Sequence, residues 1–410
     1  MTDTSQITNG SLVLAATDAA AGGPEHVSAP TAYDAILLAG FGGPEGQDDV
    51  IPFLRNVTRG RGIPDERLEE VAHHYRHFGG VSPINAHNRA LKAALEAELA
   101  ARGIELPVLW GNRNWAPYLE EAVQDAADQG HTKLIAIATS AYSSYSSCRQ
   151  YREDFARVLD TTGLEGSLQI DKVRQFFDHP GFVRPFIDGV RDAIAEAVTA
   201  NDGLDVATEL QVLFSTHSIP SSDAERSGPA DRGFGPDGAY AAQHEAVAQV
   251  VLDTAWSELL ETPLGAGLVG SAQPSWKLVF QSRSGPPSMP WLEPDINDHM
   301  RELAEGPTRA VVIVPLGFVS DHMEVMWDLD EEATETAQEL GFWSTRIPTP
   351  GIDPAYVSGL VDLVLERRDG VPAAERPHVT DLGPWYDVCR PGCCENVRAG
   401  FKPAVAGLRP

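Results

Sequence analysis

The chain has 410 residues, of which 42% are hydrophobic, and its formal net charge at pH 7 is −28. A chain of this length can form two α/β domains or one large domain with a sizeable core. So large a negative charge argues against nucleic acids and anionic membrane surfaces as partners, because both repel an acidic protein.

Residues 1–31 are rich in Thr, Ala, Gly and Ser and show no hydrophobic periodicity, which predicts a disordered tail. They lack the basic start and apolar core of a signal peptide. No segment of the chain approaches the roughly 18 uninterrupted apolar residues of a transmembrane helix. We therefore expect a cytoplasmic protein without a transmembrane segment.

Residues 32–200 alternate short apolar runs with amphipathic stretches, starting with an apolar strand. This alternation predicts a parallel sheet, which binds ligands at the carboxyl ends of its strands. Tyr142 and Tyr151 follow one predicted strand end, and their rings suit a flat ligand, although such rings are more often part of the core. A loop with Arg59 and Arg61 is suited to gripping carboxylates. An ordinary solvated loop is an equally good interpretation.

The alternation restarts and continues through residues 201–368, so we expect two similar doubly wound halves with parallel sheets. A strand at 209–215 precedes His217, and a β-branched strand at 310–314 precedes an acidic helix at 322–339. A neutral imidazole can be a metal ligand or a proton acceptor. A lone histidine after a strand is more often a satisfied loop residue.

The acidic helix is expected to begin at Asp321 as its N-cap. Glu324, Asp328 and Glu332 follow at i, i+4 and i+8, which places three carboxylates on one helical face, with Glu331 beside them. Like charges at this spacing repel unless a cation or solvent offsets them. Hard divalent cations prefer such oxygen ligands. The sequence leaves two interpretations open, a metal site and a solvated acidic face.

Residues 369–410 form a Cys-containing extension that is rich in Pro, Gly and Arg. It carries Cys389, Cys393 and Cys394, and Cys148 completes a set of four. Four thiolates suit a [2Fe–2S] cluster or zinc. The adjacent pair at the end of the motif is an unusual spacing for one cluster, and free thiols in a flexible tail are the alternative.

Two of these segments carry a resemblance to a known family. STHSIP at 215–220 and PLGFVSDHMEVMWDLD at 315–330 resemble the signature segments of ferrochelatases, the class II chelatases that insert Fe(II) into a porphyrin. RGRGIPDERLEEVAHHYRHFGGVSPINAHN at 59–88 resembles the family's porphyrin-contacting segment. QSRSGPPSMPWLEPD at 281–295 resembles the segment before its acidic unit. The resemblance covers about residues 33–368.

The resemblance implies two doubly wound halves with a porphyrin cleft between them. It implies that His217 and Glu324 are catalytic and bind the Fe²⁺ substrate, and that Asp328 and Glu332 form a secondary metal site. The expected porphyrin contacts are Phe41, Arg59, Arg61, Ser82, Arg113, Tyr142 and Tyr151. Many family members carry tyrosine where Phe41 stands, and phenylalanine cannot ligate iron.

The cysteine tail resembles that of actinobacterial ferrochelatases, which use coproporphyrin III, and several ferrochelatases hold a [2Fe–2S] cluster in such a tail. The expected activity is therefore iron insertion into coproporphyrin III to give coproheme in haem biosynthesis. A protoporphyrin IX ferrochelatase, a cobalt or nickel chelatase, and a non-catalytic haem or porphyrin carrier are the alternatives. We expect a monomer that meets other proteins of the haem pathway only transiently.

Overall fold

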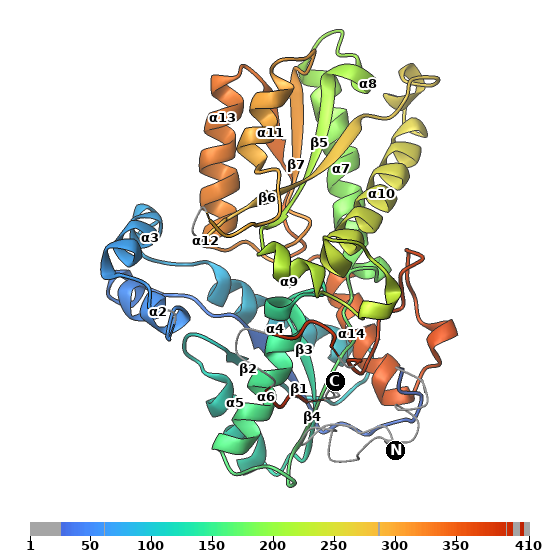
Figure 1. Cartoon of the computed structure of the whole chain (residues 1–410). Coiled ribbons are helices and arrows are strands. Elements are labelled where there is room, and N and C mark those ends of the chain that lie inside the picture. The colour runs from blue at the N-terminus through green and yellow to red at the C-terminus, as the bar shows by residue number, and fades with distance from the viewer. Residues whose placement is uncertain (1–25, 61, 286–287, 391, 397–401, 406–410) are drawn as a thin grey trace.

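A computed structural model describes residues 26–60, 62–285, 288–390, 392–396 and 402–405 of the chain (Figure 1). Arg61 and most of the predicted disordered tail lie outside the described residues.

Two four-stranded sheets organise the fold, and every strand pair in both is parallel. The strand orders, β2-β1-β3-β4 and β6-β5-β7-β8, are the same when each sheet is numbered from its first strand. This arrangement confirms the prediction of two similar doubly wound halves. The strands are β1 (Ala35–Gly40), β2 (Val108–Asn112), β3 (Lys133–Ala138), β4 (Gln169–Lys172), β5 (Leu210–His217), β6 (Ser275–Gln281), β7 (Ala310–Val314) and β8 (Trp343–Arg346).

Helices cover both faces of each sheet (Figure 1). Within the described residues, none has the length and apolar character that a membrane span requires. The helices are α2 (Val50–Val57), α3 (Asp65–His77), α4 (Ile84–Ala101), α5 (Leu119–Asp128), α6 (Gln150–Thr161), α7 (Pro180–Ala200), α8 (Val206–Glu209), α9 (Ser221–Glu225), α10 (Gly238–Leu260), α11 (Ile296–Leu303), α12 (Met323–Val325), α13 (Ala333–Glu339) and α14 (Pro354–Asp369), with π-helical turns at Tyr145–Arg149 and Met326–Glu332.

The two sheets share one continuous hydrophobic core. Alternate residues of a strand point to opposite faces, so Ile36 and Leu38 join this shared core while Leu37 packs beneath α5 and α6. The shared core is filled by side chains of α4, α7, α10 and α14. Strands buried on both faces explain the continuous apolar runs in the sequence.

Two helices cross between the halves. Helix α7 comes before β5 in the chain but packs against β7, β8 and α10, whereas α14 follows β8 and packs against α7 and α4. A Cβ built on Gly181 would lie 2.9 Å from the Cα of Gly359, so glycine permits the close approach of α7 and α14. The division of the chain at residue 200 stays a prediction.

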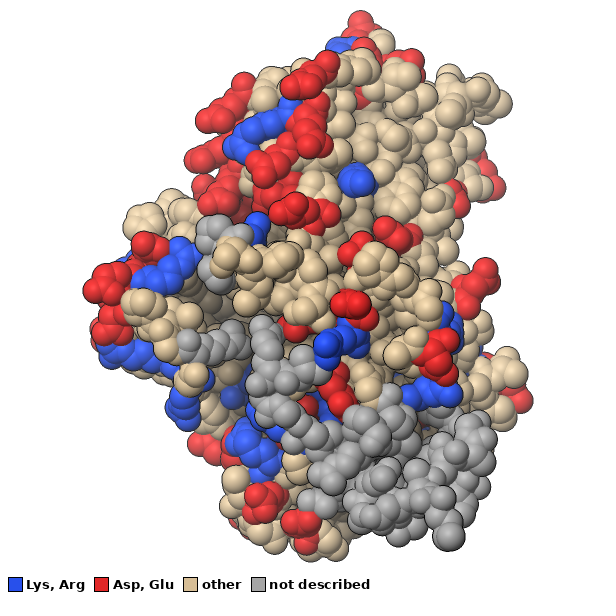
Figure 2. Space-filling view, in the orientation of Figure 1, with Lys and Arg blue, Asp and Glu red and all other residues tan. Residues whose placement is uncertain are grey.

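Acidic side chains gather over the part of the second half that holds α11 and α13 (Figure 2). These helices cover the outer face of the second sheet, where Met300, Ala333 and Ala337 pack against it. On the face shown in Figure 2, acidic side chains are therefore concentrated over the helical layer formed by α11 and α13.

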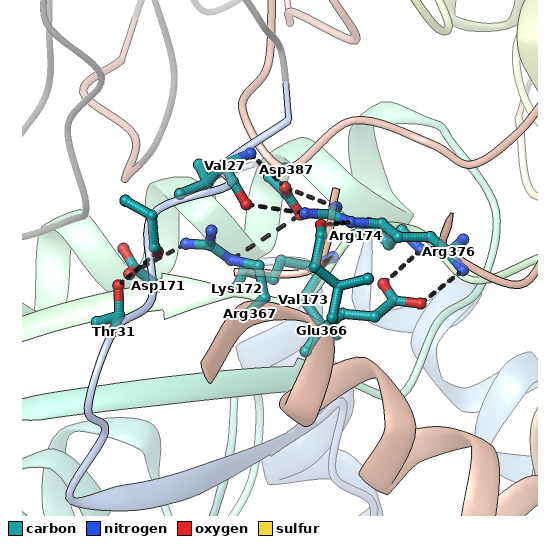
Figure 3. Close-up of polar contacts among 12 residues, drawn as sticks. Val27, Thr31, Asp171, Lys172, Val173, Arg174, Glu366, Arg367, Arg376 and Asp387 are labelled. Carbon is teal, nitrogen blue, oxygen red and sulfur yellow. Dashed lines mark hydrogen bonds and ion pairs between the residues drawn. The ribbon is translucent and has the colours of Figure 1, made fainter. Parts of the chain in front are cut away.

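A buried network of charges joins the first residues described to the C-terminal extension (Figure 3). The backbone N–H of Val27 donates to Asp387 at 2.7 Å, and Arg376 donates to the carbonyl oxygen of Val27 at 2.9 Å. Arg376 also pairs with Asp387, and Arg367 pairs with Asp171. Residues 26–31 therefore differ from the predicted disordered tail, because buried charges hold them in place.

Candidate active site

The centre of the candidate site lies where two neighbouring strands of the second sheet end. His217 is the last residue of β5, and Glu324 lies on α12, which follows β7. The imidazole Nε2 of His217 is 3.5 Å from the Glu324 Oε2. Parallel strands β5 and β7 are paired, so the segments that follow them leave the sheet at the same edge.

A glycine lets the segment after β7 lie against β5. The Gly317 N–H donates to the carbonyl oxygen of Ser215 at 3.1 Å. A Cβ at Gly317 would lie 2.0 Å from the Thr216 hydroxyl, so any larger residue would push this segment away. The close approach helps to bring Glu324 to His217. In Figure 1, α12 lies at the end of the second sheet that faces the first half.

His217 and Glu324 form a charge pair. The Nδ1–H of His217 donates to the Ser218 carbonyl oxygen, which leaves Nε2 directed at Glu324. Burial alone would lower the pKa of His217, but the charge and hydrogen bond of Glu324 outweigh it and raise this pKa to about 9. Burial would likewise raise the pKa of Glu324, but His217 lowers it to about 2. About half of the Glu324 side chain is exposed, so solvent weakens this coupling.

Asp328 is the second carboxylate of the site, and its pKa is raised whereas that of Glu324 is lowered. Gln281, the last residue of β6, and Ser282, which follows it, both donate hydrogen bonds to the Asp328 carboxylate. Burial, together with the charges of Glu324 and Glu332, raises the pKa of Asp328 to about 7. A carboxyl group with this pKa can accept or release a proton near neutral pH.

The helix that carries the acidic residues is not the regular α-helix that the sequence predicted. Residues 326–332 form a π-helical turn between α12 and α13, and such turns are frequent at functional sites. Its wider turn means that i, i+4 spacing no longer stacks side chains in one line. Glu324, Asp328 and Glu332 nevertheless stay close enough for their charges to interact.

The predicted helix cap was wrong. His322, and not Asp321, caps α12, because its Nδ1 accepts a hydrogen bond from the Glu324 N–H at 3.2 Å. Asp321 instead pairs with Arg346 and accepts from Thr349. His322 therefore lies beside the His217–Glu324 pair, and burial lowers its pKa. No spacing in the sequence distinguished His322 from its neighbours.

The acidic residues continue outward from Glu332 into a recess of the surface. The recess lies between α11 and α13 and has Glu332, Glu335, Glu339 and Asp295 among its lining residues. His217 and Glu324 do not line it. The carboxylates thus extend from the His217–Glu324 pair to the outer surface.

Helix α3 of the first half reaches this region. Its His74 stacks on Trp327 with ring centroids 4.1 Å apart and planes 6° from parallel. His73 and His77 meet the same indole edge-on, and His77 Nε2 lies 3.7 Å from the Glu331 carboxylate. The sequence did not indicate these contacts of Trp327, because they depend on how the two halves pack.

Some predicted porphyrin contacts are accessible in the structure and others are not. Phe41 follows β1, is 37% exposed and meets Phe53 edge-on. Arg59 is exposed and hydrogen-bonds to Asn56. Ser82 is only 4% exposed, and it does not cap α4, whose N-cap is Pro83.

Three other candidates have structural partners in the interior. Tyr142 is 1% exposed and stacks on His244 at 3.5 Å in the shared core, so it offers no surface to a ligand in this conformation. Tyr151 is 3% exposed and lies beneath the Arg113 guanidinium. Arg113 is committed to an ion pair with Asp154 at 2.7 Å. For these residues a core or packing role is the simpler interpretation.

The structure brings all four cysteines together, although Cys148 lies far from the others in sequence. All four are buried. The sulfurs of Cys393 and Cys394 are 3.8 Å apart, and Cys389 packs with both in one buried cluster. The Cys148 and Cys393 thiols lower the pKa of Cys389 well below its usual value. The Gly228 N–H also donates to the Cys394 sulfur at 3.2 Å.

Comparisons with known proteins agree on one family. A family model described as Ferrochelatase matches residues 33–368. A protein of Leifsonia xyli subsp. xyli named coproporphyrin III ferrochelatase is 69% identical, covering 97% of this chain and 100% of the relative. A protein of Tropheryma whipplei with the same name is 56% identical, covering 92% and 93%. The structure of SirB from Bacillus subtilis with Fe3+ is 13% identical, with a TM-score of 0.43. The match covers 85% of this chain and 100% of that chain. This chain belongs to the ferrochelatase family.

Proposed function

We propose that this protein inserts ferrous iron into coproporphyrin III to give coproheme. The observation that carries the proposal is the His217–Glu324 pair, 3.5 Å apart at the strand ends of the second sheet. An imidazole and a carboxylate are suited both to holding a divalent cation and to accepting protons. The relatives from Leifsonia xyli and Tropheryma whipplei, both named coproporphyrin III ferrochelatase, support the choice of porphyrin.

Iron insertion requires a held Fe²⁺ and acceptors for two pyrrole protons. His217 must be neutral to bind a metal, so an incoming cation competes with the proton that the imidazole shares with Glu324. Asp328, whose pKa is about 7, is a further acceptor in reach of the same centre. Glu332 and the recess beyond it supply oxygen ligands for a secondary site along the route of the cation.

The porphyrin is expected to lie between the second-sheet edge and the first half. Phe41 and Arg59 are exposed on the first half, and α3 touches Trp327 near the reacting pair. Arg59 would bind propionates, of which coproporphyrin has four, through charge-assisted hydrogen bonds. Ser82 completes this proposed contact set. The protein is expected to act as a cytoplasmic monomer.

A competition assay tests the choice of substrate. Coproporphyrin III and protoporphyrin IX are offered together with Fe²⁺ under argon, and both products are followed by absorption. We expect metallation of coproporphyrin III to dominate over many turnovers. Preferential metallation of protoporphyrin IX would support the other ferrochelatase reaction. One equivalent of bound porphyrin without turnover would support a carrier, and Co²⁺ or Ni²⁺ insertion in place of Fe²⁺ would support a different chelatase.

We further propose that Cys148, Cys389, Cys393 and Cys394 hold a [2Fe–2S] cluster. Two thiolates on one tetrahedral ion at about 2.3 Å lie about 3.8 Å apart, which matches the Cys393–Cys394 separation. Within the described residues, no group of three or more His, Cys, Asp or Glu side chains is arranged to hold a metal ion. When bound, such a cluster supplies one-electron redox chemistry and joins the extension to the first half.

A further inference from the structure

One buried amide side chain joins three segments of the candidate active site. Gln281, the last residue of β6, is 1% exposed. Its Oε1 accepts a hydrogen bond from the Ser215 hydroxyl on β5 at 2.8 Å. Its Nε2 donates to the backbone carbonyl oxygen of Glu324 at 3.1 Å and to the Asp328 carboxylate at 3.3 Å. The side chain therefore connects β5 to the two carboxylate residues that follow β7.

The partners of Gln281 fix the orientation of its amide. A carbonyl oxygen and an ionised carboxylate can only accept hydrogen bonds, so the amide nitrogen has to face Glu324 and Asp328, and the amide oxygen has to face the hydroxyl on β5. The main chain is held as well, because the Ser218 N–H donates to the Gln281 carbonyl oxygen at 2.7 Å. His217 is the register partner of Gln281 in the sheet. Both carboxylate residues are thus tied to the strand pair that ends at His217.

The residue after Gln281 supports the same carboxylate. Ser282 has a φ of 62°, a left-handed conformation that residues other than glycine rarely adopt. Its hydroxyl donates to the Asp328 carboxylate. Strained backbone of this kind is concentrated at functional sites, where the surrounding contacts hold it in place. Two consecutive side chains at the end of β6 are therefore committed to the segment that follows β7.

Gln281 is suited to holding other groups and not to reacting itself. It is buried, so it offers almost no surface to a substrate, and its amide neither accepts nor releases a proton near neutral pH. A carboxylate in the same place would turn an acceptor towards two other acceptors. The position therefore requires a neutral side chain that donates on one side and accepts on the other.

We propose that Gln281 is a positioning residue of the active site, which holds Glu324 and Asp328 in place relative to His217 through its buried amide. The Ser215 hydroxyl anchors this amide from β5. The inference rests on the iron-insertion activity proposed above and assigns Gln281 no contact with the porphyrin or with Fe²⁺. Displacing a reacting group by about 1 Å can cost about a hundredfold in rate, so loss of these contacts should slow turnover and leave substrate binding intact.

The test compares Gln281 with a matched glutamine at the other end of the same strand pair. Gln211 on β5 accepts a hydrogen bond from the Ser275 hydroxyl on β6 at 2.6 Å, which repeats the serine–glutamine contact away from the site. Turnover of coproporphyrin III with Fe²⁺ under argon and the free energy of unfolding in urea are measured for the full unaltered chain, Gln281→Leu, Gln281→Glu and Gln211→Leu. We expect kcat to fall about tenfold or more in both Gln281 variants with the porphyrin KM unchanged, and to stay near normal in Gln211→Leu.

The outcomes separate this inference from the activity on which it rests. A near-normal kcat in Gln281→Leu would overturn the inference, and so would a raised porphyrin KM at unchanged kcat. Equal losses of kcat and of unfolding free energy in Gln281→Leu and Gln211→Leu would indicate a structural role alone and would also overturn it. No turnover by the unaltered protein would overturn the proposed function, and the inference with it. If Gln281→Leu does not fold, Ser215→Ala decides the question, because it removes only the anchor of the amide and should lower kcat without changing the porphyrin KM.

Discussion

Replacing Glu324 with glutamine should lower the pKa of His217. The change keeps the shape of the side chain but removes the charge that raises this pKa from 6.5 to about 9. A difference of about 2.5 pH units corresponds to about 3.4 kcal/mol. Half of the Glu324 side chain is exposed, so we expect screening to leave about 1–2 kcal/mol. The His217 pKa should therefore fall by about one pH unit.

The assay is an NMR titration of protein labelled at its histidine rings, with a chelator present to exclude metal ions. His217→Gln identifies the signal, and His299, whose partner Glu302 is distant from the site in the chain, is the matched control. A signal of His217 that titrates near 6.5 in the unaltered protein would refute the reasoning. So would a pKa that is the same in Glu324→Gln.

The same pair links stability to pH. The folded-state pKa of His217 is raised, so its stabilising contribution is complete below pH 6.5 and is lost as the pH rises towards 9. The pKa of Glu324 is lowered, so its contribution is complete above pH 4.5 and is lost as the pH falls towards 2. Urea unfolding between pH 6.5 and 9 should therefore show a steeper loss of stability in the unaltered protein than in Glu324→Gln.

Three further predictions concern other parts of the molecule. Asp328→Asn with Glu332→Gln should raise the Fe²⁺ concentration for half-maximal rate more than it lowers the maximal rate, because both carboxylates lie on the proposed cation route to His217 and Glu324. An unchanged iron dependence in initial-rate assays would exclude these two residues from iron delivery. Cys148→Ser should remove most iron and sulfide and expose the extension to proteases, and full metal content in the variant would exclude Cys148 as a ligand. Burial lowers the pKa of His244 to about 3, so this residue should cost about 1.4 kcal/mol of folding stability for each pH unit below 6.5. The stability of His244→Asn should therefore depend less steeply on pH between about pH 7 and 5. Parallel profiles of unfolding free energy against pH for the variant and the unaltered protein would contradict this.

The architecture could be predicted because parallel sheets have a strong local signature. Apolar strands such as β1 and β7 are buried on both faces and alternate with helices, so the pattern of the chain determines the class. The meeting of His217 and Glu324 was predictable for a related reason, since the carboxyl ends of neighbouring parallel strands lie at one edge.

Other parts of the fold and of the candidate site depend on long-range contacts, which the spacing of residues in the sequence does not encode. The π-helical turn at 326–332 changes a hydrogen-bond register, and no residue pattern specified it. Tyr142 looked like a ligand contact because it follows a strand, but helices α7 and α10 bury it. Trp327 meets His74 only because α3 of the first half reaches the second. Such long-range packing cannot be derived from local periodicity.

The most direct test of the account is iron insertion by purified protein and two variants. Unaltered protein, His217→Ala and Glu324→Gln are each given coproporphyrin III and Fe²⁺ under argon, and porphyrin binding is measured separately by fluorescence. We expect many turnovers by the unaltered protein and at least a hundredfold loss, about 2.7 kcal/mol of transition-state stabilisation, in each variant with porphyrin binding retained. Near-normal turnover in either variant, or no turnover by the unaltered protein, would contradict the assignment of this pair as the reacting centre.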